Sequence, residues 1–280
     1  MEDSPLVWWN GRVLPEWDAQ APAISQGLLW GRGIFETLGV WDGQPFALTR
    51  HLERLRAAAA RLKLEIPTDE AWREAIATLL AARQPRTARL RLTVTGGGHP
   101  GLSLDSGDEN ILIRLTPYEP VTTPAAVLTV PWRRNEFSAL AGLKSTSYAE
   151  NAIAMAWVRE RDATEACFLN TGGDLCEGAA SNLFLVKDGA VMTPSIGSGC
   201  LPGITRALVI ELCEQLEIPC AVRAVTPREA VEADAIFLTS SLRGVQPVIT
   251  LDNRACPADD PVTAILSAAL ERLRRTLPDP

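Results

Sequence analysis

Three tight turns, each built on an Asn-Gly or Asp-Gly pair, constrain the fold of this chain most. The pairs are Asn10-Gly11, Asp42-Gly43 and Asp188-Gly189, and each lies between two runs of apolar residues. A two-residue hairpin turn needs a positive φ at both central residues, which Asn, Asp and Gly tolerate best. A fourth pair, Asp252-Asn253, predicts one more hairpin. We therefore expect antiparallel sheets rather than a barrel of repeated strand-helix units.

Two segments after the second turn have apolar residues at spacings of three and four, which predicts helices. These segments are 50–66 and 69–83. The next segment, 87–97, alternates with a period of two and is expected to form a strand. One face of that strand should carry Leu90, Leu92 and Val94.

A proline-rich stretch without periodicity divides the chain. Residues 118–128 read YEPVTTPAAVL, and Pro117 precedes them. Linkers between domains often have this composition, and 280 residues with 46% hydrophobic content suffice for two cores. We expect an α+β fold with a small α+β domain over 1–119, a linker over 120–124 and a larger domain over 125–280.

The charge balance excludes several classes of ligand. The net charge is −7 and the pI about 5.1, so nucleic acid and anionic membranes would find no basic surface. No stretch of about 20 uncharged apolar residues suggests a membrane span, and the acidic N-terminal segment lacks the pattern of a signal peptide. Six cysteines without a CxxC pair indicate reduced thiols, and we expect a cytoplasmic protein.

Histidine is rare in this sequence. Only His51 and His99 are present, which excludes a metal site built on several histidines, so we expect no metal. His51 lies in a predicted amphipathic helix, where a packing role is more common than catalysis. The segment 30–35, WGRGIF, lacks the third glycine of a dinucleotide-binding turn, and neither a GxSxG elbow nor a GxxxxGK(S/T) loop occurs.

Lysine is almost absent, which makes each lysine informative. Of the 27 lysine and arginine residues, only Lys63, Lys144 and Lys187 are lysine. Only lysine has a primary amine that can lose its proton near neutral pH and condense with a carbonyl. Lys144 follows a strand that ends near Trp132 and a loop of small residues, and it is our candidate for such chemistry. An ordinary loop lysine is the alternative.

Three further features follow Lys144 along the chain. Glu177 precedes the small residues 178–180 and a strongly apolar strand, so it is either a carboxylate beside a flat ligand or a surface turn residue. The turn at 202–205 starts a helix whose amides either bind an anion or are simply capped. The strand that ends at 239–241 carries three successive hydroxyl groups, which alone are common turn chemistry.

These four features together meet the requirements of pyridoxal 5′-phosphate. That cofactor needs an amine for its aldehyde, an acid that keeps its ring nitrogen protonated, and amides with hydroxyls for its phosphate. Lys144, Glu177, the turn at 203–205 and the Ser240-Ser241 pair supply each requirement once. The joint match is more specific than any single member.

The motifs LKSTSY, CEGAASNLFLV, LPGITR and FLTSS resemble those of the fold type IV pyridoxal phosphate enzymes. This group contains branched-chain aminotransferases, D-amino acid aminotransferases and 4-amino-4-deoxychorismate lyases, and the likeness runs from about Gly27 to Leu251. It implies a small α+β domain, a larger pseudo-barrel domain, bound pyridoxal 5′-phosphate and a homodimer. By this resemblance Lys144 is the catalytic Schiff-base lysine, Glu177 contacts the ring nitrogen and Leu201 packs on the ring. The residues that would hold the phosphate are Ile204, Thr205, Ser240, Ser241 and, from an HxxRL motif, Arg54.

Details of the motifs distinguish the members of this group. D-amino acid aminotransferases carry a tyrosine at the position of Phe35, and an arginine-x-histidine carboxylate trap where this chain reads TGGGHPGLS at 95–103. Branched-chain enzymes share LPGITR, but small residues and Asn usually follow their lysine. The runs 35–38 and 239–248 resemble the lyases that form 4-aminobenzoate and pyruvate from 4-amino-4-deoxychorismate for folate biosynthesis. We therefore predict the lyase, with an aminotransferase of branched-chain or D-amino acids as the alternative.

The predicted substrate is a dianion, which an acidic protein must bind with local arginines. Arg243 follows the Ser240-Ser241 pair by two residues and is the first candidate, and Arg32 is the second. Phe35 is expected in the same substrate site. Two other classes remain as alternatives: an aldolase that uses Lys144 without a cofactor, and a binding module that uses the helix start at 202–205 for a phosphorylated ligand.

Overall fold

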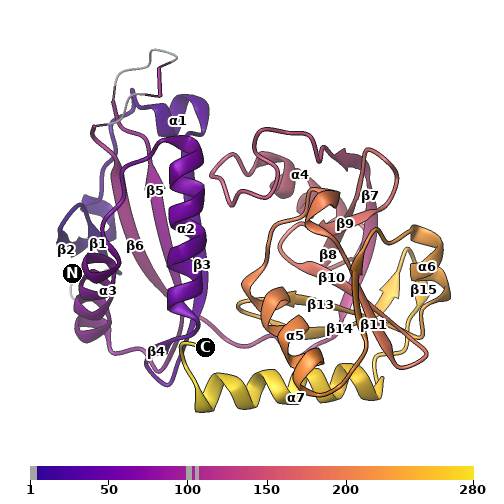
Figure 1. Cartoon of the computed structure of the whole chain (residues 1–280). Coiled ribbons are helices and arrows are strands. Elements are labelled where there is room, and N and C mark those ends of the chain that lie inside the picture. Colours follow the sequence, from indigo (N-terminus) through magenta and orange to yellow (C-terminus); the bar gives the residue numbers. More distant parts are fainter. Residues whose placement is uncertain (1–4, 99–102, 105–106) are drawn as a thin grey trace. The chain divides into compact units, whose positions relative to one another are not determined.

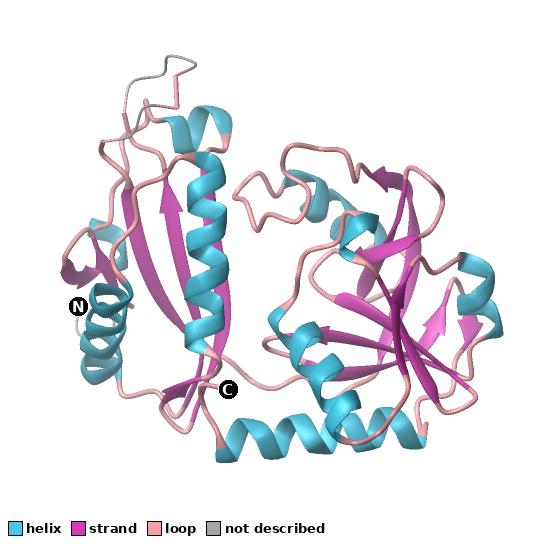
Figure 2. Ribbon diagram, in the orientation of Figure 1, coloured by secondary structure: helices cyan, strands magenta, loops and turns pink. Residues whose placement is uncertain are grey.

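A computed structural model describes residues 5–98, 103–104 and 107–280, which form two compact units (Figure 1, Figure 2). The first contains the chain up to Glu119 together with Leu143–Ser147 and Leu277–Pro280, and the second contains Pro120–Gly142 and Tyr148–Thr276. Main-chain hydrogen bonds attach the two short segments to the first unit. Phe35 N donates to Lys144 O over 2.9 Å, and Ala47 N donates to Pro278 O over 2.7 Å. The first unit therefore includes nine residues that the sequence boundaries place in the larger domain.

The first unit is a six-stranded antiparallel sheet in the order β2-β1-β6-β5-β3-β4. Helices α2 and α3 contribute to the core of this sheet, and α2 runs alongside β3 (Figure 1). The elements are β1 (Leu6–Trp9), β2 (Arg12–Pro15), a short 3-10 turn (Glu16–Asp18), α1 (Gln26–Trp30), β3 (Gly33–Trp41), β4 (Gln44–Pro45), α2 (Leu48–Leu62), α3 (Asp69–Arg83), β5 (Thr87–Thr95) and β6 (Asn110–Pro117).

The core of the first unit follows from the two predicted periodicities. Along β5, every second side chain is buried in this core, which confirms the predicted face. Side chains at helical spacing from α2 and α3 cover the same face, because an amphipathic helix buries one stripe. The core includes Leu90, Leu92 and Val94 from β5, Leu52 and Leu55 from α2, and Trp72, Ile76 and Leu79 from α3.

The second unit is built on a curled nine-stranded sheet in the order β12-β11-β10-β13-β14-β7-β8-β9, with β15 paired to β14. Most pairs are antiparallel, while β14–β7, β7–β8 and β11–β12 are parallel. The elements are β7 (Ala125–Arg134), α4 (Ala149–Arg159), β8 (Glu165–Asn170), β9 (Leu175–Gly178), β10 (Asn182–Lys187), β11 (Ala190–Pro194), a 3-10 turn (Ile196–Ser198), α5 (Ile204–Gln215), β12 (Cys220–Arg223), α6 (Pro227–Glu232), β13 (Ala235–Ser240), β14 (Gly244–Leu251), β15 (Arg254–Ala255) and α7 (Pro261–Thr276).

Strand β8 is buried on both faces, because the curled sheet has a separate apolar cluster on each side. Cys167 and Leu169 point into one cluster, and Ala166 and Phe168 point into the other. All six residues of β8 are buried, including Glu165. A buried carboxylate in such a strand needs charged and polar partners, which the site below supplies.

Local predictions from turn residues are confirmed. Asn10, Asp42 and Asp188 have φ values of 44°, 46° and 49°, each followed by a glycine with positive φ. Asp252 and Asn253 also have positive φ. Side-chain caps begin two of the helices, since Thr68 caps α3 and Thr226 forms a capping box with Glu229 at α6. Among the described residues, no helix combines the length and the apolar character that a membrane crossing needs.

Candidate active site

Lys144 is fixed against the start of β3. Phe35 N donates to Lys144 O, and Thr146 N donates to Gly33 O over 2.8 Å, so residues 144–146 lie along the strand like a short extra strand. An added Cβ at Gly33 would lie 2.5 Å from Thr146 Oγ1, so only glycine permits this approach. The glycines of the WGRGIF segment therefore allow residues 144–147 to pack closely against it.

The Lys144 amine lies over an aromatic ring that it shares with an arginine. Lys144 Nζ is 4.6 Å from the centre of the Phe35 ring, and Arg91 Cζ is 3.7 Å from the same centre. Both distances fit cation–π contacts. Phe35, one of the predicted substrate residues, is thus beside the predicted reactive amine. Sequence reasoning missed Arg91, because the alternating pattern of β5 only marks it as facing away from the core.

A buried carboxylate, Glu36, joins two residues of the HxxRL motif on α2. Arg54 donates to it twice, from Nε to Oε1 over 2.8 Å and from Nη2 to Oε2 over 2.6 Å, and His51 Nδ1 lies 2.7 Å from Oε2. Side-chain exposure is 1% for Glu36 and His51 and 12% for Arg54. Glu36 has the same strand parity as the core residues of β3, which aims it at α2.

The electrostatics of this cluster favour an ionised carboxylate. Burial by itself would raise the pKa of Glu36, but the charge and hydrogen bonds of Arg54, supported by His51, outweigh burial and hold that pKa well below its usual range. Burial lowers the pKa of His51, and Arg54 and Lys144 lower it further, while Glu36 opposes them. His51 therefore donates from Nδ1 as a neutral imidazole, and Glu36 carries the negative charge.

In the second unit, Glu177 is held at the end of β9 by two groups. Its Oε2 accepts a hydrogen bond from Leu201 N over 2.8 Å, and its Oε1 lies 3.4 Å from Arg134 Nε. Its side chain is 13% exposed. A carboxylate oxygen can accept more than one bond, so these contacts orient Glu177 and still leave it capacity for a ring nitrogen. The structure thus places the predicted acid next to Leu201, the predicted ring-packing residue.

The loop that carries Leu201 is fixed from the other side by Asn182. Asn182 Nδ2 donates to Leu201 O over 2.9 Å. An added Cβ at Gly203 would lie 1.9 Å from Asn182 Oδ1, so the loop can approach the strand only with glycine at this position. Helix α5 begins directly afterwards at Ile204, with Gly203 as its N-cap and Thr205 buried in its first turn.

The start of α5 has the features of an anion site. Among the described residues, no side chain caps this helix, so its first amides rely on other partners. Thr239, in the neighbouring hydroxyl run, has a buried Oγ1 without a hydrogen-bond partner in the described part of the chain. Uncapped amides and an unsatisfied hydroxyl are the donors that a phosphate group requires. The residues of this unit therefore fit the phosphate and ring nitrogen of pyridoxal 5′-phosphate.

The two arginines predicted to bind substrate have other partners. Arg243 follows Ser240 and Ser241, and its N donates to Ser240 Oγ over 3.3 Å, but its Nη1 lies 2.7 Å from the fully buried Glu165. Ser181 Oγ donates to the same carboxylate over 3.1 Å. The main partner of Arg243 is therefore a buried charge that its sequence position does not reveal.

Arg32 is buried, with 5% exposure, and its guanidinium donates to main-chain carbonyls. Nε donates to Leu62 O over 3.1 Å and Nη2 to Leu104 O over 3.0 Å, and Lys63 O and the Gln26 amide accept further bonds. These bonds tie α1, the end of α2 and a distant loop together. They favour a structural role for Arg32. His99, in the run compared with the carboxylate trap, lies outside the described residues.

Tyr148 and Asn151 also position the segment that follows Glu177. Tyr148 Oη donates to Ala179 O over 2.8 Å, and Asn151 Nδ2 donates to the same oxygen over 2.6 Å. The small residues after Glu177 are therefore anchored by the start of α4. Tyr148 belongs to the LKSTSY motif, but the sequence alone does not show that its hydroxyl bonds Ala179.

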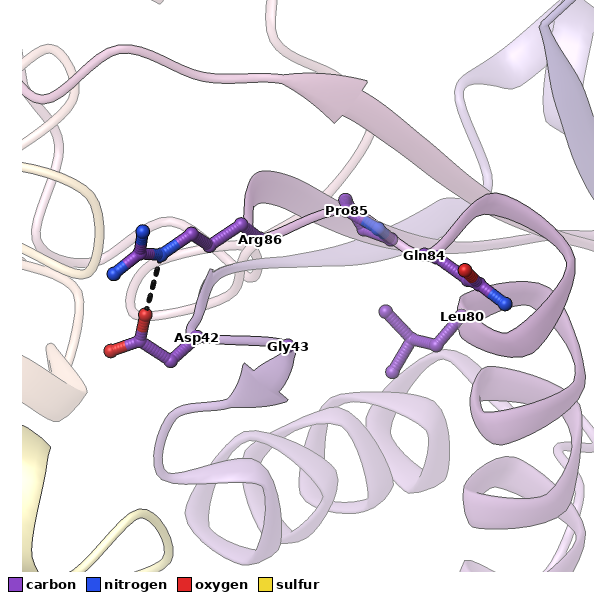
Figure 3. Close-up of a pocket in the computed structure, with 6 residues that line it drawn as sticks. All are labelled: Asp42, Gly43, Leu80, Gln84, Pro85 and Arg86. Carbon is purple, nitrogen blue, oxygen red and sulfur yellow. Dashed lines mark hydrogen bonds and ion pairs between the residues drawn. The ribbon is translucent and has the colours of Figure 1, made fainter.

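A surface hollow near the β3–β4 turn is unrelated to these residues. Figure 3 shows its lining, which includes none of the predicted site residues. Arg86 Nε and Asp42 Oδ1 form an ion pair of 2.9 Å there, and both side chains are mostly exposed. Exposed pairs of this kind contribute little. The residues that line the hollow are Asp42, Gly43, Leu80, Gln84, Pro85 and Arg86.

The sequence has many relatives along most of its length. A putative branched-chain-amino-acid aminotransferase of Methanocaldococcus jannaschii is 32% identical over 254 residues, which are 89% of this chain and 88% of that protein. The aminodeoxychorismate lyase of Bacillus subtilis is 28% identical over 256 residues, which are 88% of this chain and 87% of that protein.

Solved structures confirm the two-domain α+β fold expected from the sequence. A branched-chain aminotransferase of Thermoproteus uzoniensis with norvaline has a TM-score of 0.91 and 29% identity, covering 97% of this chain and 95% of its own. A putative 4-amino-4-deoxychorismate lyase of Legionella pneumophila has a TM-score of 0.88 and 28% identity. The match covers 92% of this chain and 96% of the Legionella chain.

A third structure bears on the cofactor. A branched-chain amino acid aminotransferase from T.th., solved with pyridoxamine 5′-phosphate, has a TM-score of 0.87 and 26% identity, and the match covers 96% of this chain and 94% of its own. Together with the family match, this complex confirms the expected cofactor, pyridoxal 5′-phosphate. The family model for amino-transferase class IV matches residues 33–251, and the chain belongs to this family.

Proposed function

We propose that this enzyme is a pyridoxal 5′-phosphate-dependent lyase that converts 4-amino-4-deoxychorismate to 4-aminobenzoate and pyruvate. The observation that carries the proposal is the pair of cations on the Phe35 ring, Lys144 and Arg91. A guanidinium beside the reactive amine suits a substrate with a second carboxylate, because charge-assisted bonds to carboxylate are strong.

Different residues have the right chemistry to bind the aldehyde, the ring and the phosphate of the cofactor. Lys144 would bind the aldehyde, Glu177 the ring nitrogen, and Leu201 would pack on the ring. When bound, the cofactor supplies an electron sink for the bond broken next to the substrate amine. The phosphate would be held by Ile204, Thr205, Ser240, Ser241 and Arg54.

The chain's own groups then perform the proton transfers. Lys144 Nζ would remove the proton from the amine-bearing carbon of the substrate. Glu177, oriented by Leu201 N and Arg134, keeps the ring nitrogen protonated. Arg91 would hold a substrate carboxylate while the bond between the ring carbon and the enol oxygen breaks. The proton taken by Lys144 would pass to the departing enol side chain, which leaves as pyruvate, and formation of the aromatic product makes this step irreversible.

An aminotransferase of branched-chain amino acids is the second candidate. It is favoured by the relatives at 32% identity from Methanocaldococcus jannaschii and Thermotoga maritima, which are named as putative and probable branched-chain-amino-acid aminotransferases. In that reaction Lys144 would return the proton to the cofactor instead of completing an elimination. D-amino acid transamination is the less favoured variant, because Phe35 replaces the tyrosine expected there.

Product analysis separates these reactions. Purified protein is supplied with 4-amino-4-deoxychorismate, and separately with leucine or D-alanine plus 2-oxoglutarate, and the products are quantified. The lyase proposal predicts equal amounts of 4-aminobenzoate and pyruvate. Robust leucine transamination without 4-aminobenzoate would overturn the lyase assignment and leave the cofactor site intact.

A matched pair of variants tests the proposed role of Arg91 beside the Phe35 ring. Arg91→Ala should raise the Michaelis constant for the dianionic substrate by the loss of a charge-assisted bond, about 1.5–3 kcal/mol. Arg89→Ala removes the same charge two residues along the same strand, where Arg89 Nε bonds Thr116 Oγ1, and should leave the constant unchanged. Equal effects of the two variants would contradict the role of Arg91.

The homodimer and the cytoplasmic location expected from the sequence stay predictions.

A further inference from the structure

Glu36, His51 and Arg54 form a buried ionic cluster in the first unit. Glu36 is the member to which the resemblance assigns no role, and it bonds both His51 and Arg54 of α2. Burying a carboxylate is costly unless every charge is paired. A purely apolar side chain, like its neighbours Ile34 and Leu38 on the same strand face, would satisfy the core without that cost. The cluster therefore calls for a functional explanation.

We propose that Glu36 is a positioning residue for the cofactor phosphate, because its carboxylate fixes the direction in which Arg54 presents its guanidinium. This inference rests on the proposed role of Arg54 toward the phosphate. It adds a residue that contacts neither cofactor nor substrate and acts only through Arg54.

The geometry supports this role in detail. Arg54 uses Nε and Nη2, one edge of its guanidinium, for the two carboxylate oxygens. A bidentate pair of this kind sets the plane of the guanidinium as well as its position. With that edge held, the carboxylate sets the plane in which Arg54 would meet the phosphate. Arg54 is also the more exposed partner, at 12% against 1% for Glu36, so the arginine end of the pair lies nearer to solvent.

His51 restricts the carboxylate in turn. As a neutral imidazole that donates from Nδ1, it occupies Oε2 at 2.7 Å, so Glu36 cannot rotate without losing a buried bond. The HxxR spacing places His51 and Arg54 one helical turn apart on α2, which lets one strand residue reach both. This explains why a histidine with no catalytic role lies in that motif.

The test compares two cofactor forms that differ only in the phosphate. The affinities of cofactor-depleted protein for pyridoxal 5′-phosphate and for pyridoxal are measured by absorbance or fluorescence titration, for the wild type and each variant. Loss of fold would weaken both ligands alike, whereas loss of Arg54 orientation weakens only the phosphate form. We expect Glu36→Gln to lower the affinity for pyridoxal 5′-phosphate by about 10- to 100-fold relative to pyridoxal.

Glu36→Asp separates position from charge. It keeps the negative charge but withdraws the carboxylate by one methylene, so the positioning role predicts that it behaves like Glu36→Gln. It also tests the proposal if Glu36→Gln does not fold. Glu53→Gln is the matched control, because Glu53 is the exposed neighbour of Arg54 on α2 and its removal changes the local charge equally. We expect it to behave as the wild type.

Three results would overturn the inference. The first is an unchanged ratio of the two affinities in both Glu36 variants. The second is tighter phosphate binding in Glu36→Gln, which would show that Glu36 only offsets the charge of Arg54. The third is an equal effect of Glu53→Gln. If the wild type bound neither cofactor form, the proposed function would fail instead, so the two failures are distinguishable.

Discussion

Gly203→Ala tests whether the loop before α5 is held as closely as the structure indicates. An alanine Cβ would lie 1.9 Å from Asn182 Oδ1 and 3.1 Å from Asn182 Cγ. Gly203 has φ −65° and ψ 135°, which any residue adopts, so the backbone adds no strain of its own. The whole effect must come from the collision, and either Asn182 or the loop has to move.

The cost follows from what Asn182 does. Its Nδ2 donates to Leu201 O over 2.9 Å, and a displaced amide leaves that carbonyl unsatisfied, which costs about 1–3 kcal/mol. Overpacking a site of this kind costs a further 1–3 kcal/mol or so. We therefore expect a loss of about 2–6 kcal/mol, which lowers Tm by about 4–24 °C for a unit of this size. Cofactor affinity should fall as well, because Glu177 bonds Leu201 N in the same loop.

Calorimetry and cofactor titration measure both effects, with two further variants as controls. Gly197→Ala adds a Cβ that meets only Ser195 Oγ at 3.5 Å, an ordinary contact, and should be nearly neutral. Asn182→Ala removes the obstruction, so the double variant should cost less than the two single changes combined, by about 0.5–3 kcal/mol. A Gly203→Ala protein as stable as Gly197→Ala, with unchanged cofactor affinity, would refute the reasoning.

Three further predictions concern charged residues. Glu177→Gln should reduce kcat more than cofactor affinity, since glutamine still accepts from Leu201 N but cannot hold the ring nitrogen protonated; if kinetics and titration show neither change, the mapping of Glu177 is wrong. Arg243→Ala should lower the free energy of unfolding by about 3–5 kcal/mol in urea titrations, because it leaves the buried Glu165 without its cation; a change below about 1 kcal/mol would contradict this. Glu36, whose folded pKa is lowered, stays ionised while the unfolded chain takes up a proton, so its contribution is complete above about pH 4.3 and is lost as the pH falls further. Urea midpoints between about pH 3 and pH 7 should therefore decline less steeply in Glu36→Gln than in the wild type, and parallel curves would disprove this linkage.

Local signals made much of the fold predictable. The hairpins were predictable because the positive φ at Asn10, Asp42 and Asp188 is a property of the turn residues themselves. Helices α2 and α3 were predictable from the three- and four-residue spacing of their apolar side chains, which is also a local property of the sequence. The docking of 143–147 and 277–280 on the first unit was not, because it depends on main-chain bonds between distant segments.

The candidate site divides in the same way. Lys144 and Glu177 could be proposed as site residues from residue type and local motif. The partners that give other residues their roles could not, because those partners lie on other elements. Arg243 reads as a loop arginine until Glu165, 78 residues away, is seen beside it. Arg91 reads as the polar side of a strand until the Phe35 ring brings it next to the lysine.

The attachment point of the cofactor tests the central claim most directly. Reduction of the holoenzyme with borohydride fixes the cofactor to the lysine that holds it, and peptide mass spectrometry then identifies that lysine. The chain is well suited to this, because Lys63, Lys144 and Lys187 are its only lysines and the other two are internal controls. We expect label on Lys144 alone and none in Lys144→Ala, which should also lose turnover. Label on Lys63 or Lys187, or label that persists in Lys144→Ala, would contradict it.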